Sequence, residues 1–410
     1  MINRFLFQLN RYAELFFSKP YKTLNWIEIS ESAVLRNMDL FQKLNLNKSI
    51  FPVLKSNGYG HGIEQFCIIF AHSNYKYLAV DSYFEALTVH QHLPKQPVLI
   101  MGYIDAINYR NIQTKNLAFV VGDIDTITKL GQTKRPFTIH LEINTGMNRH
   151  GIRPDELQQT LDLIKSYSNL YLEGIMSHLA NSDSNDNGFN ELQVSIFDDC
   201  VEQIQSVYQL KYIHIQQTSG SATTTSKHAN TLRVGRILIG INNILPSHPS
   251  YDQHKFLEAP LEYKSTITKI IHLKKNEMVG YGCSFVADED MVIGVLPIGY
   301  YDGVKRILGN NGVVKYISKN TNTKISQNYF LPIVGRICMN IMMIRLDKDF
   351  QNQAIIASNG LLPQSGDEIT VFSKYPNDPN SLIQLENRTD IYHLEWLVNI
   401  PSTARRVIVN

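Results

Sequence analysis

The chain has 410 residues, of which 43% are hydrophobic and 19% charged, and its formal net charge at pH 7 is +2. This length predicts roughly two to three domains, and the composition excludes a mainly disordered chain. The near-neutral charge argues against a nucleic-acid-binding protein, which more often carries a strong basic excess. No apolar run reaches the length of about 18 residues that a membrane-spanning helix needs, so no membrane partner is expected.

Residues 1–20 form an apolar stretch that is broken by Gln8, Asn10, Arg11 and Glu14. These polar residues, and the lack of a small-residue cleavage site after them, disfavour a secretory signal peptide. The pattern predicts a short amphipathic leader helix. A membrane-surface anchor is the alternative, because basic and aromatic residues occur together in this stretch.

The cysteines are far apart in the sequence, at Cys67, Cys200, Cys283 and Cys338. They form no Cys-x-x-Cys pair, and no histidine lies at zinc-finger spacing from them. A disulfide framework or a metal site is therefore not expected, and reduced thiols in a cytoplasmic protein fit the pattern better.

Short apolar runs alternate with helical stretches between about residues 50 and 245. Near-continuous apolar runs of this length are typical of parallel strands that are buried on both faces. The segments between them have helical spacing, as in 157–167 and 197–210. The sequence therefore predicts an α/β fold, a (β/α)8 TIM-type barrel within residues 21–255. The eight strand candidates are 51–57, 77–82, 97–102, 117–122, 137–144, 172–178, 212–218 and 232–240.

The pattern changes after about residue 255, where β-rich segments follow one another with turn residues between them. This predicts a C-terminal, mostly antiparallel β domain over residues 256–410. An early strand at 24–30 can join that domain, and Ser30 is placed to cap the helix that follows. The β-rich segments are 261–273, 291–301, 312–317, 329–346 and 367–372.

Polar residues at the carboxyl ends of the barrel strands are the candidates for chemistry, because active sites of such barrels lie there. Lys55 follows the apolar residues FPVL, where desolvation would favour its neutral amine and the formation of a Schiff base with a carbonyl compound. A surface lysine is the simpler alternative. The following residues, SNGYGHG, argue against it, because three glycines in five residues suit a backbone packed close to a ligand.

Hydroxyls and glycines at later strand ends suggest a phosphate site. Thr218 and Ser219 lie in HIQQTSGS, Arg233 and Gly235 lie in LRVGR, and His178 ends GIMSH. Phosphate sites of these barrels commonly lie after the seventh and eighth strands. A lysine on the first strand together with such a site indicates a phosphorylated carbonyl cofactor, for which pyridoxal 5'-phosphate is the natural candidate.

The segment VLKSNGYGHG resembles the pyridoxal-phosphate signature of the alanine racemase family. The resemblance covers roughly residues 23 to 407, and its further motifs follow in the family's order: NTGMNRHGI, SHLANSDSND, HIQQTSGS, LRVG, VGYGCSF, PIGYYDGVKR and VGRICMN. It implies a barrel followed by a β domain. It also implies a head-to-tail homodimer in which the partner's β domain completes each active site.

The resemblance implies a two-base mechanism of racemisation. Lys55 would hold the cofactor and act as a base on one face of the substrate, and Tyr281 of the other subunit would be the base on the opposite face. Arg233 would bind the pyridine nitrogen and keep it unprotonated. Tyr281 could otherwise be a core or rim tyrosine, and only its motif singles it out.

The resemblance also assigns the binding residues. Tyr59 and Thr218 would bind the phosphate, together with Ser219 and backbone groups near Gly235, and His178 would support the ring. The substrate would be bound by Arg149, with Tyr300 and Met339 lining its pocket from the partner subunit. Arg149 could alternatively be a plain surface arginine, and His178 a core histidine.

Three positions depart from the family pattern. Glu142 replaces a lysine that many members carbamylate, and we predict that its carboxylate pairs with Arg149 directly or through water. Asn340 replaces an aspartate and loses its charge. Ile408 falls nearest a C-terminal tyrosine that contacts the phosphate in the family, which leaves alanine selectivity open.

The sequence therefore predicts an isomerase, a pyridoxal-phosphate-dependent racemase of alanine that would supply D-alanine to cell-wall precursors. A broader racemase of small amino acids such as serine is one alternative. A lyase or decarboxylase on the same barrel is a second, against which the Tyr281 motif argues. A non-catalytic pyridoxal-phosphate carrier is a third, and such carriers lack a second domain.

Overall fold

The computed structural model describes residues 22–112, 114–184, 188–319, 326–350 and 362–410. The predicted leader helix at 1–20 lies outside the described residues. No helix in the described ranges is long and apolar enough to cross a membrane. The chain divides into a barrel unit (Glu28–Glu262, Ser373–Ser402 and Arg406–Asn410) and a β unit (the chain up to Ile27, Tyr263–Phe372 and Thr403–Arg405).

All eight predicted barrel strands are present, and they are parallel. Strands β3 to β8 form one six-stranded sheet in chain order, and β2 pairs with β9. A bridge between Val53 and Ala79 joins β2 to β3, and the Asn230 N–H donates to the Ile213 carbonyl at 3.0 Å to join β9 to β8, which closes the ring. The strands are β2 (Ser49–Pro52), β3 (Leu78–Val80), β4 (Val98–Ile100), β5 (Leu117–Val121), β6 (Phe137–Glu142), β7 (Leu170–Met176), β8 (Tyr212–His214) and β9 (Thr231–Val234).

The inside of the barrel is filled by side chains from alternate strand positions, as in other barrels of this type. Phe51, Tyr77 and Tyr212 form its aromatic centre, with the Phe51 ring 5.2 Å from Tyr77 and 5.0 Å from Tyr212. These strands are buried on both faces, and for this reason they read as continuous apolar runs in the sequence.

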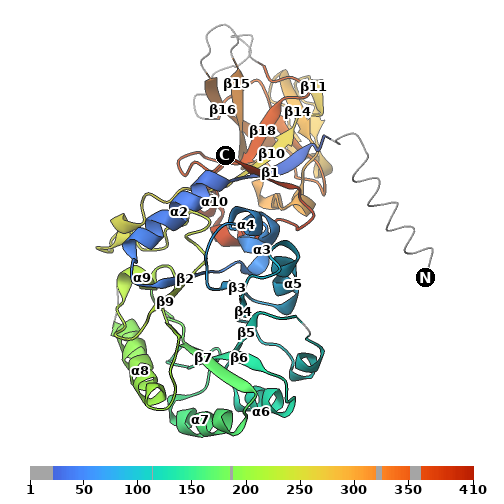
Figure 1. The fold of residues 1–410 in the computed structure, drawn as a ribbon. Coiled ribbons are helices and arrows are strands. Elements are labelled where there is room, and N and C mark those ends of the chain that lie inside the picture. The colour runs from blue at the N-terminus through green and yellow to red at the C-terminus, as the bar shows by residue number, and fades with distance from the viewer. Residues whose placement is uncertain (1–21, 113, 185–187, 320–325, 351–361) are drawn as a thin grey trace, which may run out of the picture. The chain divides into compact units, whose positions relative to one another are not determined.

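Helices surround the strands on the outside of the barrel (Figure 1). The helix predicted at 157–167 is α7. The helix predicted at 197–210 is α8, which begins nine residues earlier, at Gly188. The sequence pattern did not predict this start because the first turns of α8 carry buried polar residues. The helices of the barrel unit are α2 (Glu31–Leu44), α3 (Lys55–Tyr59), α4 (Ile63–Ile69), α5 (Tyr83–His92), α6 (Ile124–Gln132), α7 (Leu157–Ser166), α8 (Gly188–Gln205), α9 (Gly220–Thr223), α10 (Leu382–Thr389) and α11 (His393–Val398).

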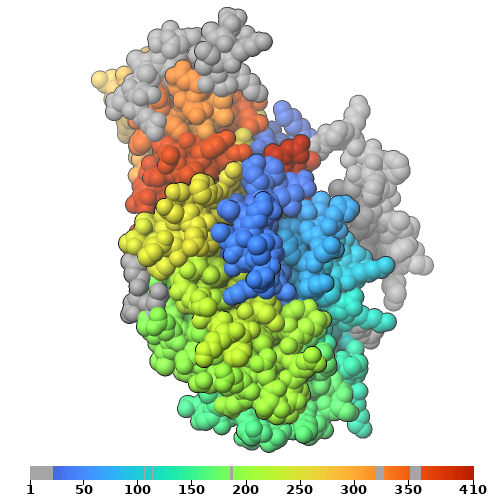
Figure 2. Space-filling view, turned by 60° about the vertical axis from the view of Figure 1, so that its left-hand side comes forward, coloured from blue at the N-terminus to red at the C-terminus, as the bar shows by residue number. Residues whose placement is uncertain are grey.

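Helix α2 begins as the sequence predicts, with the Ser30 side chain accepting a hydrogen bond from the Ala33 N–H at 3.2 Å. The side chain of Asn37, in the same helix, donates to the carbonyl of Glu258 at 2.8 Å and accepts from the Glu258 N–H at 3.0 Å. This exchange holds the segment of residues 240–260 against α2, where Figure 2 shows the yellow segment beside the blue helix.

The β unit is mostly antiparallel, and each β-rich segment of the sequence contains at least one strand of it. The sheet order is β11-β14-β17-β16-β15-β18-β10 and continues into β1 and β19. A core of apolar side chains packs on it, including Val279, Ile293 and Val334. β1 (Asn25–Ser30) crosses the boundary between the two units, and β19 (Arg406–Val409) belongs to the barrel unit. The other strands are β10 (Leu261–Thr266), β11 (Lys269–Leu273), β12 (Met278–Val279), β13 (Phe285–Val286), β14 (Met291–Leu296), β15 (Val313–Lys319), β16 (Ser326–Val334), β17 (Met342–Arg345) and β18 (Glu368–Phe372).

Candidate active site

Lys55 follows the first barrel strand and starts the short helix Lys55–Tyr59. Its next three residues, Ser56, Asn57 and Gly58, have φ angles of 56°, 53° and 60°, so the backbone makes a left-handed turn. A left-handed residue other than glycine costs about 1–2 kcal/mol. Such a turn persists only where the surrounding structure holds it in place.

The carboxylate of Glu85 holds this turn. Its Oε1 atom accepts hydrogen bonds from the backbone N–H groups of Ser56 and Asn57, at 2.7 and 3.4 Å. Its Oε2 atom accepts from the N–H groups of Asp81 and Ser82, at 2.8 and 3.2 Å. One side chain therefore ties the residues after Lys55 to the start of α5. Glu85 was not among the predicted site residues, although Ser82-x-x-Glu85 is a recognisable capping-box pattern.

The next feature is a cradle of hydrogen-bond donors around Gly235. A Cβ atom at Gly235 would lie 2.2 Å from the Tyr59 hydroxyl oxygen, so only glycine fits beneath that ring. The Thr218 side chain is almost fully buried. Among the described residues, the hydroxyls of Tyr59 and Thr218 and the N–H groups of Gly235 and Arg236 have no hydrogen-bond acceptor. Burial raises the pKa of Tyr59 to about 12, so its hydroxyl keeps its proton at neutral pH.

Arg233 lies in the barrel interior with 3% of its surface exposed. Its Nη1 atom donates to the Nδ1 and carbonyl atoms of His214, at 2.6 and 2.7 Å, and its Nη2 atom donates to the Ser177 carbonyl at 2.6 Å and to His178 Nδ1 at 3.2 Å. Its Nε atom has no acceptor among the described residues. Burial lowers the pKa of Arg233 to about 10, which still leaves the guanidinium charged at neutral pH.

A chain of buried side chains continues from Arg233. Because a guanidinium only donates, His214 Nδ1 must accept, so neutral His214 donates from Nε2 to His140 Nδ1 at 2.8 Å. His140 Nε2 then lies 3.5 Å from Glu173, which also accepts from Tyr77 at 2.6 Å. Burial lowers the pKa of both histidines, and the positive charge of Arg233 adds to the effect. The chain thus fixes the tautomers beneath Arg233.

Glu142, Arg149 and His178 line one small recess at the ends of β6 and β7. Burial lowers the pKa of His178 well below its usual value, and the charges of Arg233, Arg149 and Lys55 lower it further. Burial also raises the pKa of Glu142, which the charges of Arg233, His150 and Arg149 oppose.

The structure shows no direct contact between Glu142 and Arg149 among the described residues, so the direct form of the predicted pairing is wrong. Neither side chain has a hydrogen bond or ion pair within the described residues. A contact through water stays a prediction.

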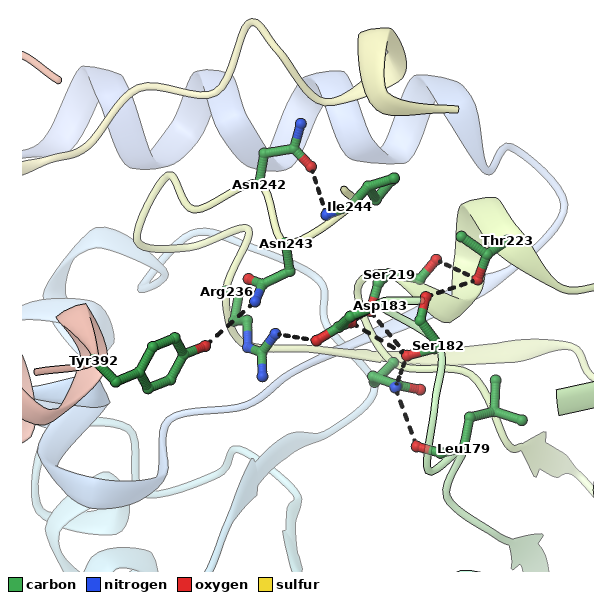
Figure 3. A network of polar contacts seen from close by, with 11 residues as sticks. Leu179, Ser182, Asp183, Ser219, Thr223, Arg236, Asn242, Asn243, Ile244 and Tyr392 are labelled. Atoms are coloured by element: carbon green, nitrogen blue, oxygen red, sulfur yellow. Dashed lines mark hydrogen bonds and ion pairs between the residues drawn. The ribbon is translucent and has the colours of Figure 1, made fainter. Parts of the chain in front are cut away.

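The loop after β8 is held by a polar network, which Figure 3 shows. The Ser219 hydroxyl bonds to Asp183 and lies 2.9 Å from the Ser182 hydroxyl, and Asp183 makes an ion pair with Arg236 at 3.1 Å. Gln217 donates to Ser182 from the same loop. The Ser219 hydroxyl is therefore engaged with Asp183, so a direct contact to a phosphate would have to come from its backbone.

The other predicted site residues lie in the β unit, on loops that face solvent. Tyr281, Tyr300 and Met339 are 73%, 42% and 55% exposed. The Tyr300 N–H donates to the Cys338 carbonyl and the Tyr301 N–H to that of Met339, both at 3.0 Å. Two of the three residues thus lie on loops that are bonded to each other.

Two further residues support the site and were missed from the sequence. The buried Gln193 side chain of α8 donates to Thr145 and to the His178 carbonyl, at 3.1 and 3.0 Å. The Arg406 side chain donates from Nε to the Gly60 carbonyl at 2.9 Å, so the C-terminal strand contacts the turn after Lys55 through Arg406. Gln193 breaks the apolar pattern of its helix, and Arg406 lies far from Gly60 in the sequence, so no local signal marks either role.

The fold and these residues define a barrel protein with a lysine and a cradle of hydrogen-bond donors at the carboxyl ends of its strands. Two family models match the chain: the N-terminal domain of alanine racemase at residues 29–243 and its C-terminal domain at 261–408. The chain belongs to the alanine racemase family, whose members are isomerases.

Individual proteins agree with this family. Alanine racemase of Helicobacter pylori strain HPAG1 is 27% identical over 89% of this chain and 94% of its own length. The solved alanine racemase of Clostridium difficile 630 has a TM-score of 0.82 at 22% identity, covering 95% and 97% of the two chains. A histidine racemase of Leuconostoc mesenteroides has a TM-score of 0.81 at 20% identity, covering 96% of this chain and all of its own. The last two similarities show the fold.

Proposed function

We propose that the protein is a pyridoxal-phosphate-dependent racemase that interconverts L- and D-alanine. The observation that carries this proposal is the set of unpartnered donors that follow the strands around Lys55. The hydroxyls of Tyr59 and Thr218 and the N–H groups beside Gly235 suit a phosphate, and Lys55 starts the strained turn next to them. A side chain at Gly235 would collide with the Tyr59 ring, so glycine at this position lets the Tyr59 hydroxyl lie close to the backbone that would meet the phosphate.

Pyridoxal phosphate, when bound, withdraws electrons from the substrate and makes its Cα proton acidic. Lys55 Nζ would hold the cofactor covalently and would remove or return the Cα proton on one face of the substrate. The free Nε–H of Arg233 would donate to the ring nitrogen. Because that guanidinium stays charged at neutral pH, it would not pass its proton to the ring, which limits side reactions such as transamination.

The second base would be Tyr281 of a partner subunit in a homodimer. Racemisation needs two bases on opposite faces of the substrate, and Tyr281 is the tyrosine in the family motif. Its exposure, together with that of Tyr300 and Met339, supports an apolar surface that another copy of the chain covers. Arg149 would bind the substrate carboxylate, and His178, held by Arg233, would support the ring.

The proposal is tested on Lys55. The purified protein is expected to absorb at the violet edge of the visible range, to lose that band on reduction with borohydride, and to carry the reduced cofactor on the peptide that contains Lys55. Lys55→Ala is expected to lose the band and to lower the rate of racemisation by about 10⁴-fold or more. Lys43→Ala, an exposed lysine of α2, is the matched control and should keep both. A wild-type protein that binds no cofactor would refute the proposal.

The choice of alanine is tested separately, because the fold is shared with a histidine racemase. Initial rates of racemisation are compared for L-alanine, L-serine and L-histidine at equal concentration. Alanine is expected to have the highest kcat/KM. A higher value for serine would establish the broader small-amino-acid racemase, and a higher value for histidine would overturn the substrate assignment.

A further inference from the structure

Arg236 contributes a backbone N–H group to the cradle, but the proposed function gives its charged side chain no role. It directly follows Gly235, and its side chain is 30% exposed. The Nη1 atom makes the ion pair with Asp183, as Figure 3 shows. The N–H groups on Nε and Nη2 have no acceptor in the described part of the chain. An arginine so placed keeps donors for a further anion.

The guanidinium is anchored rather than free to swing away. Asp183 accepts from the hydroxyl of Ser219 and is 3.4 Å from the hydroxyl of Ser182. The Thr223 hydroxyl donates to the carbonyls of Ser182 and Ser219, both at 3.2 Å. The loops after β7 and β8 are thereby joined, and Asp183 holds Arg236 from this rigid pair of loops.

The positive charge of Arg236 affects the pKa values of residues at the cradle. Burial raises the pKa of the Tyr59 hydroxyl, and the positive charge of Arg236 is the main effect that opposes the rise. Arg236 also contributes to the lowered pKa of His178. The donors of the cradle, the hydroxyls of Tyr59 and Thr218 and two backbone N–H groups, are all neutral. A phosphate dianion bound by neutral donors alone would keep its full charge in a partly desolvated place.

Arg233 cannot supply the missing charge through its terminal nitrogens, because both are bonded to His214, Ser177 and His178. We propose that Arg236 is a direct ligand of the cofactor phosphate, which it binds through its remaining N–H groups while Asp183 holds its other side. This inference rests on the proposed function, since it needs a cofactor that carries a phosphate. It makes Arg236 a determinant of cofactor affinity in this chain.

The test compares two ligands that differ only in the phosphate. The cofactor-free protein is titrated with pyridoxal phosphate and with pyridoxal, and the dissociation constants are measured by absorbance and fluorescence. Arg236→Met is expected to raise the Kd for pyridoxal phosphate by about 10-fold or more, the effect of losing a charge-assisted hydrogen bond. The Kd for pyridoxal should change by less than about twofold, because that ligand has no phosphate to lose.

Two variants control the experiment. Arg236→Lys keeps a point charge and is expected to lose less affinity for pyridoxal phosphate than Arg236→Met. Arg36→Met removes an arginine from an exposed ion pair on α2 and should change neither constant. An unchanged Kd for pyridoxal phosphate in Arg236→Met, or an equal loss for both ligands, would overturn the inference. If the wild-type protein binds neither ligand, the proposed function itself fails.

Discussion

Arg233 in the barrel unit is 3% exposed and has both terminal nitrogens hydrogen-bonded, whereas Tyr281 in the β unit is 73% exposed and its hydroxyl has no hydrogen bond within the described residues. The same contrast holds for their neighbours. His214 is fully buried and bonded on both ring nitrogens, while Met339 in the β unit is more than half exposed. The barrel unit positions Arg233 and His214 by its own contacts, whereas the β unit presents Tyr281 and Met339 to solvent.

This difference has a physical meaning. Groups that act on a substrate must be held to a fraction of an ångström, and packing and hydrogen bonds provide that order. Arg233 and His214 already have it within one chain, whereas Arg149 is exposed and has no hydrogen bond or ion pair among the described residues. The β-unit residues lack it, and under the proposed function a second copy of the chain would supply this order. Exposed aromatic side chains are typical of surfaces that bind another protein.

The largest expected effect tests this comparison directly. Tyr281→Phe keeps the ring and removes the hydroxyl, and should lower the rate of L-to-D racemisation by about 10²–10⁴-fold. When inactive Lys55→Ala and Tyr281→Phe proteins are unfolded, mixed and refolded together, hybrid dimers with one intact shared site should form. Activity should then return to about one quarter of the wild-type value, since half of the dimers are hybrids with one active site in two.

The controls separate sharing of sites from other causes. Each variant refolded alone should stay inactive, and Tyr281→Phe should change the free energy of unfolding by less than about 0.5 kcal/mol because its side chain is exposed. If the mixed sample stays inactive while size exclusion shows dimers, each site uses both residues of one chain, and the comparison drawn above is wrong.

The sequence predicted the barrel better than it predicted the support of the site. The apolar runs mark the strands because both faces of a parallel strand are buried, and Ser30 marks the start of α2 through local capping. Lys55, Thr218 and Gly235 were found because strand ends and family motifs point to them. Their roles in binding the cofactor stay predictions.

Residues that support the site through hydrogen bonds to distant parts of the chain could not be predicted from the sequence. Glu85 reaches the N–H groups of Ser56 and Asn57 only once β2 and β3 lie side by side. Arg406 reaches Gly60 from the end of the chain. The start of α8 was missed because Gln193 is polar in sequence and yet buried through hydrogen bonds with the loop after β7. The periodicity of apolar residues predicts which side chains are buried, but it does not predict which backbone group a polar side chain will contact.

The next effect concerns the stability of the barrel unit. Burial alone would raise the pKa of Glu173, but hydrogen bonds from His140, Tyr77 and Lys211 outweigh it and lower the pKa to about 2. The ionised carboxylate therefore stabilises the fold above pH 4.5, and this contribution is lost as the pH falls toward 2. By this linkage it amounts to at most about 3 kcal/mol at neutral pH.

Urea unfolding of wild type and Glu173→Gln at pH 7, 4.5 and 3 measures this contribution. The variant should be less stable at pH 7, and the gap should narrow as the pH falls. Glu191→Gln, at an exposed glutamate of α8 with no ion pair among the described residues, should show no such narrowing gap. A difference in the free energy of unfolding between wild type and Glu173→Gln that is constant with pH would contradict this expectation. It would mean that the charge of Glu173 does not stabilise the hydrogen-bonded side chains beneath Arg233.

The smallest effect tests how the turn after Lys55 is held. In Glu85→Gln an amide with one acceptor oxygen faces two pairs of N–H groups, so one pair loses its acceptor, at a cost of about 1–3 kcal/mol in the free energy of unfolding. Lys55 should then be placed less accurately, and kcat should fall about tenfold with little change in KM. Ser82→Ala weakens the start of the same helix by about 1 kcal/mol without touching the turn, and should leave kcat unchanged. An equal loss of kcat in both variants would show that Glu85 acts through the helix as a whole, whereas a loss confined to Glu85→Gln would show that this single carboxylate positions Lys55.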